Sequence, residues 1–386
     1  MGARIEQVEV RVFATLDWTT KDSDGHTHPG PERRAEHALL TVRDGDGAEG
    51  HCLCSGEALR PSVLDGFVRK VVIGEDPFMR ERVWNRLYRM QRGSGGQLTD
   101  RAIGYLDQAL WDLAGRKLGA PVWQLLGGAR STVPAYASTM CGDDIEGGLR
   151  TPEDYGRFAE ALVATGYSAV KLHTWMPPVP GAPDPDMDAR ACAAVREAVG
   201  PDVPLMLDAN HWYTRTQALA LGRALQQLDY YWYEEPMEEA STSSYRWLAE
   251  QLEIPVIGPE TAFGRVHTRA EWIAQGACDI VRVGVNDTGG ITPAMKIVHL
   301  ADAFNMDAEV HGGGSGNLAI LGAMENGRWY ERGLLHPHFD YDAVPPHLNS
   351  AVDPIDEHGN VQMPEAPGLG DDLCFEHIDE NIVARW

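Results

Sequence analysis

The sequence predicts an α/β protein in which a barrel of parallel strands follows a smaller α+β domain. Three apolar runs between residues 205 and 260 each end in a carboxylate, and these acids follow one another at equal intervals of 26 residues: Asp208, Glu234 and Glu260. One strand, one helix and two connections take up about that length, so each acid is expected at the carboxyl end of a parallel strand. At 386 residues the chain is too long for one small core, and it fits a barrel of roughly 250 residues with a second domain beside it.

The first 130 residues have the features of an α+β domain. Alternating apolar residues over 5–13 and 38–42 predict an antiparallel hairpin. The stretch between them, 17–34, is polar and rich in Gly and Pro, and predicts a long loop that is either solvated or a lid contacting substrate through Trp18, His26 and His28. Helical periodicity then predicts helices over 61–72, 79–90 and 100–118.

From Val133 onward, short apolar runs alternate with helical patterns. Strands are predicted over 133–137, 169–173, 204–207, 230–233, 256–257, 279–283 and 307–310, with an eighth near 329–331. Helices are predicted over 154–165, 187–199, 215–228, 242–252, 269–276 and 291–305. Strands that are apolar on both faces indicate a parallel sheet covered by helices, whose commonest closed form is an eight-fold barrel. We place this barrel at 131–345 and expect the tail, 346–386, to pack back across the first domain (1–130).

Composition narrows the classes of partner. The formal net charge of −24 argues against nucleic acid or an anionic membrane, because both repel an acidic surface. No stretch has 18 consecutive apolar residues, and the amino terminus lacks a basic region followed by an apolar one. The six cysteines show no metal-ligand spacing and are interpreted as reduced thiols. We therefore expect a cytoplasmic protein that acts on a small molecule.

The residues at the predicted strand ends form a highly charged set: Lys171, His173, Asp208, Asn210, Glu234, Glu260, Gly284, His311 and Glu331. Three carboxylates that converge in a partly desolvated site repel one another, and a hard divalent cation with oxygen ligands is the usual solution. Lys171 and His173 are two residues apart, so on a strand they face the same side, the barrel interior. A single Lys at a strand end is most often a salt-bridge partner, but this combination at successive strand ends indicates an active site.

Several motifs carry a resemblance to a known family. They are the spaced acids, Glu234-Glu235-Pro236, the run 279–282 leading to Gly289-Gly290-Ile291-Thr292, and the segment 109–113 before 124–128. Together they resemble the mandelate racemase and muconate lactonizing enzyme branch of the enolase superfamily. The resemblance implies a modified (β/α)8 barrel of the (β/α)7β type, capped by an α+β domain made from the amino-terminal segment and the carboxyl-terminal tail. It also implies Mg²⁺ at Asp208, Glu234 and Glu260, a substrate carboxylate on that metal, and bases on opposite faces drawn from Lys171, His173 and His311.

The sequence departs from the family pattern at two positions. His173 stands where racemases have the second Lys of a Lys-x-Lys pair, so either it or Lys171 could exchange the proton next to the substrate carboxylate. Gly284 stands where the family has the aspartate partner of His311, and Asp287 lies three residues further on. A histidine without that carboxylate is expected to be less basic, which suits a general acid better than a racemase base.

A general acid opposite a base favours β-elimination from a hydroxyl-rich acid. Polar and aromatic residues on loops that could face such a substrate are Asn210, His211, Trp175, Tyr213, Trp18, His26 and His28, and Glu331 matches a carboxyl that contacts the substrate carboxylate. We expect an acid-sugar dehydratase that gives a 2-keto-3-deoxy acid. The alternatives are a cycloisomerase of an anhydro-sugar acid or lactone and a non-catalytic sugar-acid sensor. A homo-oligomer is expected.

Overall fold

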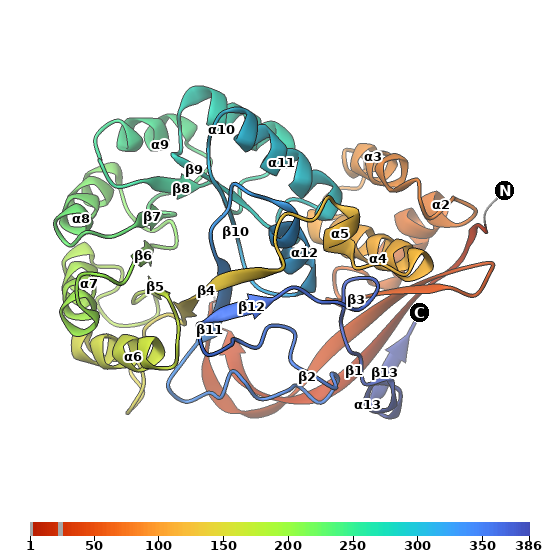
Figure 1. Cartoon of the computed structure of the whole chain (residues 1–386), viewed down its shortest axis with the longest axis horizontal. Coiled ribbons are helices and arrows are strands. Elements are labelled where there is room, and N and C mark those ends of the chain that lie inside the picture. The colour runs from red at the N-terminus through yellow and green to blue at the C-terminus, as the bar shows by residue number, and fades with distance from the viewer. Residues whose placement is uncertain (1–2, 22–25) are drawn as a thin grey trace.

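The computed structural model describes residues 3–21 and 26–386 of the chain. Figure 1 shows a barrel of strands and outer helices on one side and a sheet with its own helices on the other. The two parts have separate apolar cores, one centred on the barrel strands and one between the amino-terminal sheet and the helices that cover it. In the described ranges, no helix combines the length and the apolar character that a membrane crossing requires.

The amino-terminal sheet has the strand order β13-β1-β2-β3. It consists of β1 (Ile5–Lys21), β2 (Thr27–Asp44), β3 (Glu49–Cys54) and β13 (Ile382–Arg385), all antiparallel. The predicted hairpin is confirmed, but the predicted loop over 17–34 is wrong in its described part, because the strands continue to Lys21 and resume at Thr27. The polar sequence reflects an exposed two-stranded ribbon, in which the backbone groups pair while few side chains are buried.

The helices of this domain are α1 (Pro61–Val63), the π-helical η1 (Leu64–Val68), α2 (Arg69–Val72), α3 (Arg80–Gln91), α4 (Asp100–Leu118) and α5 (Val122–Leu125). The helix α4 has the predicted bounds because both ends carry sequence signals. At its start the Thr99 hydroxyl accepts a hydrogen bond from the Ala102 N–H, and at its end Gly119 adopts a positive φ of 65°. Most of α4 is buried, because it lies between the amino-terminal sheet and the barrel.

Eight parallel strands form the barrel, in the order β10-β9-β8-β7-β6-β5-β4-β11. They are β4 (Thr132–Thr139), β5 (Ala169–His173), β6 (Leu205–Asp208), β7 (Trp232–Glu234), β8 (Val256–Gly258), β9 (Ile280–Val283), β10 (Ala308–Val310) and β11 (Tyr330–Leu335). Because β11 pairs with β4, the eighth strand lies beside the first. Near β10 the closing contacts include hydrogen bonds from the Arg328 and Trp329 N–H groups to the Glu309 carboxylate. The predicted barrel with its cap is confirmed.

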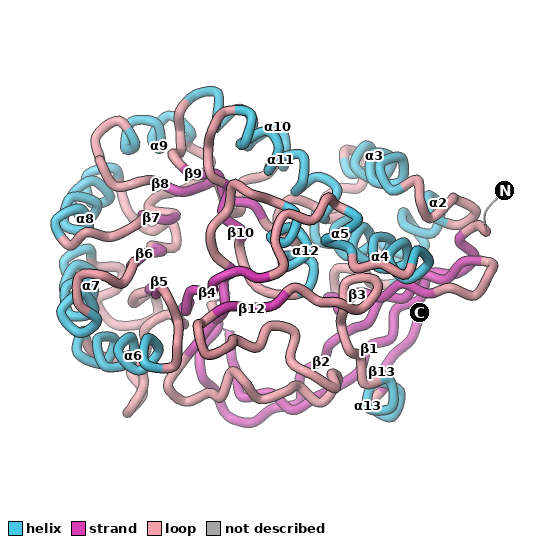
Figure 2. Tube along the Cα trace, in the orientation of Figure 1, coloured by secondary structure: helices cyan, strands magenta, loops and turns pink. Residues whose placement is uncertain are grey.

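The outer helices are α6 (Pro152–Ala164), α7 (Pro185–Val199), α8 (Arg215–Gln227), α9 (Thr242–Ala249), α10 (Arg265–Gln275), α11 (Ile291–Ala303) and α12 (Ser315–Ala323). Figure 2 shows them as an arc of helices outside the strands. The sequence did not predict α12, because its residues are apolar and buried on all sides and so lack amphipathic periodicity.

The barrel interior is layered. The layer nearest the amino-terminal ends of the strands is apolar and includes Tyr136, Ala169, Met206, Trp232, Ile257, Ile280 and Trp329. Side chains two residues further along a strand point to the same side. The next layer therefore contains Lys171, Asp208, Glu234, Arg282 and Glu331, and all of these are buried. An aromatic and aliphatic floor thus lies under a layer of charges.

The carboxyl-terminal segment contacts both parts of the molecule. Its strand β12 (Asn360–Gln362) pairs with β4 of the barrel, and β13 pairs with β1 after the helix α13 (Phe375–Glu380). The Trp386 indole N–H donates to the Leu59 carbonyl oxygen at 2.7 Å. The segment therefore crosses from the barrel to the first domain, while the boundaries at 130 and 345 stay predictions.

Candidate active site

The predicted site residues converge at the carboxyl ends of the barrel strands. A cavity of about 290 Å³ opens there, and its lining includes His173, Asp208, Asn210, Glu260, His311 and Glu331. Residues Lys21, His26 and Thr27, from the hairpin end of β1 and β2, line the same cavity. The cap therefore contributes to the wall of a chamber whose base is the charged layer.

Lys171 lies deepest in this group and is surrounded by carboxylates. Its Nζ is 2.9 Å from Glu331 Oε1, 3.1 Å from Glu234 Oε2 and 3.4 Å from Asp208 Oδ2. Burial by itself would lower the pKa of Lys171, but Glu234 and Glu331 outweigh burial and raise this pKa well above its usual value. Lys171 is therefore held as an ammonium group by its neighbours.

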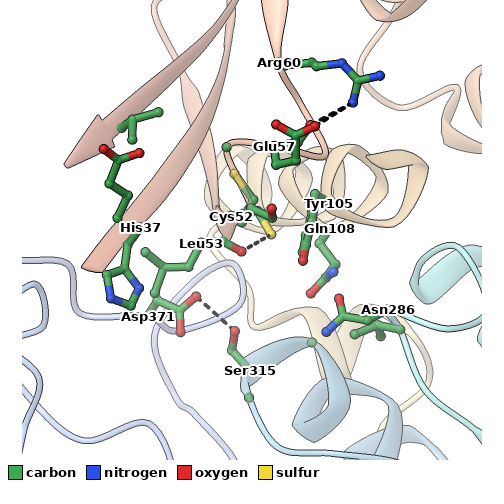
Figure 3. A pocket seen from close by; sticks show the side chains of 18 of the residues that line it. His37, Cys52, Leu53, Glu57, Arg60, Tyr105, Gln108, Asn286, Ser315 and Asp371 are labelled. Carbon is green, nitrogen blue, oxygen red and sulfur yellow. Dashed lines mark hydrogen bonds and ion pairs between the residues drawn. The ribbon is translucent and has the colours of Figure 1, made fainter. Parts of the chain in front are cut away.

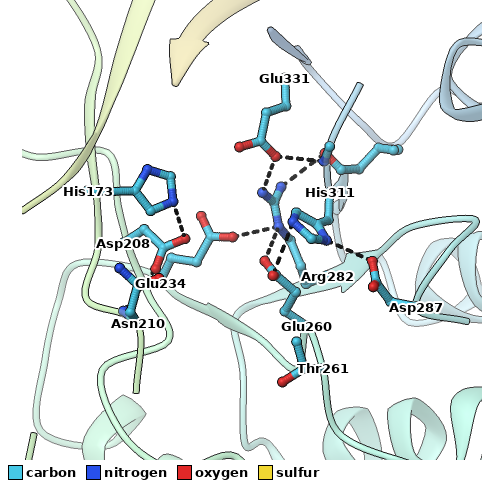
Figure 4. Close-up of polar contacts among 12 residues, drawn as sticks. His173, Asp208, Asn210, Glu234, Glu260, Thr261, Arg282, Asp287, His311 and Glu331 are labelled. Atoms are coloured by element: carbon cyan, nitrogen blue, oxygen red, sulfur yellow. Dashed lines mark hydrogen bonds and ion pairs between the residues drawn. The ribbon is translucent and has the colours of Figure 1, made fainter. Parts of the chain in front are cut away.

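His173 lies two residues after Lys171 on β5, on the same face of the strand. Its Nδ1 is 2.8 Å from the Thr139 carbonyl oxygen, and its Nε2 is 3.1 Å from Asp208 Oδ2 (Figure 4). A carbonyl oxygen only accepts hydrogen bonds, so Nδ1 carries a proton in both charge states of the ring. In a neutral His173 the free lone pair is consequently on Nε2, which faces the cavity side of the ring.

The acidic residues have two different environments: three form a cluster, and Glu234 contacts buried cations. Carboxylate oxygens of Asp208, Glu235 and Glu260 all lie within 4.8 Å of one another. Glu234 instead points toward Lys171, toward the Trp232 indole N–H at 3.0 Å and toward Arg282 Nε at 2.6 Å. Of the three acids predicted as metal ligands, the structure thus brings Asp208 and Glu260 together, and it adds Glu235, which the sequence reasoning did not single out.

The cluster has the properties of a cation site. Among the described residues, neither Glu235 Oε1 nor Glu260 Oε2 accepts a hydrogen bond, although both are buried. Burial and the neighbouring carboxylates raise the pKa of Glu235 and of Glu260 well above the usual range. Buried, mutually repelling carboxylate oxygens that accept no hydrogen bond fit a hard divalent cation such as Mg²⁺.

Arg282 is a buried cation in the motif 279–282, and the sequence alone assigns it no role. Besides Glu234, it contacts Glu331, with Nη2 2.8 Å from Oε2, and it donates to the Tyr136 hydroxyl at 3.1 Å. The signal that could have found it is its position on β9, two residues before Gly284 and therefore on the inward face. With Lys171 it balances the charge of the acids below the cluster.

His311 stands on the opposite side of the cavity and has a carboxylate partner. Its Nδ1 is 2.7 Å from Asp287 Oδ2, and its Nε2 is 3.1 Å from Glu260 Oε1. Asp287 therefore supplies the carboxylate partner of His311, which the glycine at position 284 had left open. A Cβ on residue 284 would lie 2.8 Å from Asp287 Oδ2, so the glycine at this strand end leaves the space that Asp287 occupies.

This pairing changes the expected basicity of His311. Burial would lower its pKa, but the negative charges of Glu260 and Asp287 raise the pKa to about 10. The imidazole is therefore stabilised as a cation, and a cation bound at the acidic cluster would leave Asp287 as its main source of stabilisation.

The remaining predicted residues are more scattered. Asn210 lines the cavity, and its backbone N–H donates to Asp208 Oδ1 at 3.0 Å. Trp175 is buried in the barrel wall, where its indole N–H donates to the Leu149 carbonyl, so it does not face the cavity. His211 is exposed and stacks on Trp212. Neither Trp18, which is 48% exposed, nor His28 lines this cavity, although both lie on the same hairpin as His26.

A second and larger cavity, of about 770 Å³, lies between the cap and the barrel (Figure 3). Its walls include Tyr105 and Gln108 from α4, Asn286 beside Asp287, and Ser315 after the glycine run that follows His311. The Ser315 hydroxyl donates to Asp371 at 2.9 Å. Segments that carry the His311–Asp287 pair thus also form this interdomain space.

The fold and the site define the class of protein: a capped barrel enzyme with an acidic cluster that could hold a metal ion, between Lys171 and His173 on one side and the His311–Asp287 pair on the other. The chain belongs to the mandelate racemase and muconate lactonizing enzyme family of the enolase superfamily. Residues 154–377 match the family description "Enolase C-terminal domain-like", and residues 16–127 match "Mandelate racemase / muconate lactonizing enzyme, N-terminal domain".

Individual relatives have related activities. D-galactarolactone cycloisomerase from Agrobacterium fabrum is 32% identical, with 90% of this chain and 92% of the relative covered. Arabinonate dehydratase from Saccharolobus solfataricus is 31% identical, with 87% and 89% covered. A crystal structure of D-glucarate dehydratase from Agrobacterium tumefaciens, complexed with magnesium, superimposes with a TM-score of 0.98 at 59% identity, over 99% of both chains.

Proposed function

We propose that this protein is a Mg²⁺-dependent acid-sugar dehydratase that converts a polyhydroxy acid into a 2-keto-3-deoxy acid. The observation that carries the proposal is the arrangement of proton-exchanging groups on two sides of the acidic cluster. His173 and Lys171 lie on one side, and the His311–Asp287 pair lies on the other. The 59% identity to a structure of D-glucarate dehydratase favours an aldaric acid, a sugar acid with a carboxylate at each end.

Asp208 and Glu260 would hold Mg²⁺, and the third carboxylate would come from the dipeptide Glu234-Glu235. When bound, Mg²⁺ supplies positive charge next to the substrate carboxylate and so makes the proton on the adjacent carbon more acidic. The ammonium group of Lys171 lies beside Glu331 at the base of the cavity, where it would attract the same substrate carboxylate.

His173 is the proposed base. Its Nδ1 proton is committed to the Thr139 carbonyl, so Nε2 is the atom that would accept the proton from the carbon next to the carboxylate. Lys171 remains the alternative base. Its ammonium form would first have to lose a proton, which becomes easier when the charge of its carboxylate neighbours is neutralised.

His311 is the proposed acid. The electron pair of the broken C–H bond forms the new double bond between the α- and β-carbons, and the bond from the β-carbon to its hydroxyl oxygen breaks. The oxygen keeps the electron pair of that bond, takes a proton from His311 and departs as water. The enol that remains tautomerises to the keto acid. Asp287 holds the ring through Nδ1, so Nε2 would be the atom that donates.

A second candidate function is supported by the 32% identical D-galactarolactone cycloisomerase. The same proton removal opens an anhydro ring or a lactone if the leaving oxygen stays tethered to the product. The two functions use the same residues and differ in the mass of the product.

Mass spectrometry separates these functions. The purified protein is incubated with Mg²⁺ and a panel of aldaric, aldonic and anhydro-sugar acids, and His311→Asn serves as the control. Loss of one water supports the dehydratase, and conversion at unchanged mass supports the cycloisomerase. If no acid reacts and none exchanges its α-proton with D2O, the proposal is wrong. If His311→Asn then also binds a sugar acid as well as the wild-type protein does, the protein is a sugar-acid sensor.

Two properties of the protein in the cell also remain proposals. We propose a cytoplasmic location, which is supported by six cysteines that are all free thiols. We propose a homo-oligomer, which is supported by large apolar side chains at the surface, including Phe263 at 92% exposure and Leu16 at 55%. Light scattering of the purified protein measures the oligomeric state.

A further inference from the structure

The loop that carries Asp287 is a compact turn between β9 and α11. It spans residues 284–290 and is closed internally, because the Thr288 N–H and hydroxyl both donate to the Gly284 carbonyl and the Gly290 N–H donates to the Val285 carbonyl. The carboxylate partner of His311 therefore lies on a loop, four residues beyond the end of β9, and its position depends on what holds this turn in place.

The cap holds this turn at close range. On α4, a Cβ on residue 104 would lie 2.9 Å from the Val285 carbonyl oxygen and 3.1 Å from the Gly290 nitrogen, so Gly104 allows the helix backbone to contact the turn. On α3, the Trp84 indole N–H donates to the Gly289 carbonyl at 2.8 Å. Two cap helices thus cover the outer face of the loop.

Asp107, one turn further along α4, fixes the point where the loop becomes a helix. Its Oδ2 accepts a hydrogen bond from the Thr292 N–H at 2.8 Å, and its Oδ1 accepts one from the Thr292 hydroxyl at 2.6 Å. Helix α11 begins after Gly290, which has no side chain to cap it. Asp107 therefore caps α11 from another domain, and a carboxylate at this end also interacts favourably with the helix dipole.

The segments around Asp107 are closely packed. Gly290 has a φ of +120°, and a Cβ there would lie 2.5 Å from Asp107 Oδ2. The Trp111 indole N–H donates to the same Thr292 hydroxyl at 3.0 Å. The segments 104–111 and 284–292 therefore interlock, and Figure 3 shows Tyr105 and Gln108 of α4 lining the same cavity as Asn286 of the loop.

We propose that Asp107 is a positioning residue for the His311–Asp287 pair, acting from the cap through Thr292 and the loop 284–290. The cap then has two tasks, to cover the substrate and to hold the carboxylate partner of the acid. The kinetic part of this proposal rests on the dehydratase function proposed above, whereas the structural part does not.

The chain offers a matched control on the same helix. Asp112 is also a fully buried carboxylate that accepts backbone N–H groups from other segments, from His51 and Leu369 at 2.8 Å each. It faces the amino-terminal sheet and the carboxyl-terminal segment and has no hydrogen bond to the loop. Replacing it tests the general cost of losing a buried carboxylate on α4.

The experiment compares Asp107→Ala, Asp107→Asn and Asp112→Ala by two measurements. Hydrogen exchange followed by mass spectrometry reports the protection of peptides over 284–292, and steady-state kinetics reports kcat and KM separately. We expect Asp107→Ala to speed exchange in that segment and to lower kcat about tenfold to a hundredfold with little change in KM. Asp107→Asn should recover most of both, because asparagine caps helices as well as aspartate does.

Asp112→Ala should lower the melting temperature while leaving exchange over 284–292 and kcat near wild-type values. Unchanged exchange in Asp107→Ala, or equal losses of kcat in the two alanine variants, would overturn the proposal. If Asp107→Ala does not fold, Thr292→Val removes only the hydroxyl partner and should change both measurements in the same direction by a smaller amount. If the wild-type protein dehydrates no sugar acid, the dehydratase function fails, but the exchange measurement still decides whether Asp107 holds the loop.

Discussion

Replacing Asp287 by Asn tests whether His311 acts as the general acid. The change keeps the size of the side chain but removes the negative charge 2.7 Å from Nδ1. A hydrogen bond to a charged group contributes about 1.5–3 kcal/mol, and one pKa unit corresponds to 1.36 kcal/mol. The pKa of His311, which Glu260 and Asp287 raise to about 10 against the effect of burial, should therefore fall by about one to two units.

The sign of the effect identifies the role of His311. A general acid must be protonated, so the rate is lost as pH rises through its pKa, and Asp287→Asn should move this high-pH loss to lower pH. A general base must be neutral, so the low-pH side of the profile would move instead. Initial rates of keto-acid formation between about pH 5 and 10 measure both sides.

The buried pair of Asp143 and His336 supplies a control for this experiment. Asp143 Oδ2 is 2.7 Å from His336 Nε2, and the pair lies outside the charged layer. Asp143→Asn makes the same chemical change and should lower stability without moving the pH profile. A profile for Asp287→Asn that coincides with wild type on both sides would refute the assignment of either proton-transfer role to His311.

Three further predictions concern the charged layer and its surroundings. Glu235→Gln should weaken Mg²⁺ binding roughly tenfold to a hundredfold in calorimetry, because a carboxylate of the acidic cluster is lost, whereas the exposed Glu238→Gln should bind like wild type. Arg282→Met should lower the free energy of unfolding by about 3–5 kcal/mol in denaturant titrations, because it removes one of the two buried cations that balance Glu234 and Glu331; a loss below about 1 kcal/mol would contradict the assigned role. Gly284→Ala should reduce turnover with Mg²⁺ affinity retained, because a Cβ would lie 2.8 Å from Asp287 Oδ2, and full activity would show that the carboxylate does not need this space.

The sequence predicted those parts of the site that depend on regular structure. The strand period places Lys171 and His173 on the interior face, and equal spacing along a repeating strand–helix unit brings Asp208 and Glu260 to one edge. These predictions need only the fold class, because every parallel strand of a barrel ends at the same rim.

Features that depend on irregular backbone could not be predicted in the same way. Asp287 reaches His311 because a glycine at the strand end opens space for it, and the conformation of the turn 284–290 is set by the cap. Whether Glu234 or Glu235 faces the cluster depends on the backbone after β7, where Glu235 has a φ of +40°. The polar segments 17–21 and 27–34 were not predicted as strands because they are stabilised by backbone pairing and have little apolar alternation.

The apolar floor of the barrel determines the side from which substrate enters and products leave the active site. Tyr136, Trp232 and Trp329 pack edge to face beneath the charges, so this end of the barrel is closed by tightly packed rings. Substrate, released water and keto acid must therefore all pass on the cap side, near the hairpin end that carries His26. Product that is still bound in this passage excludes the next substrate molecule. The keto acid is therefore expected to inhibit the enzyme competitively.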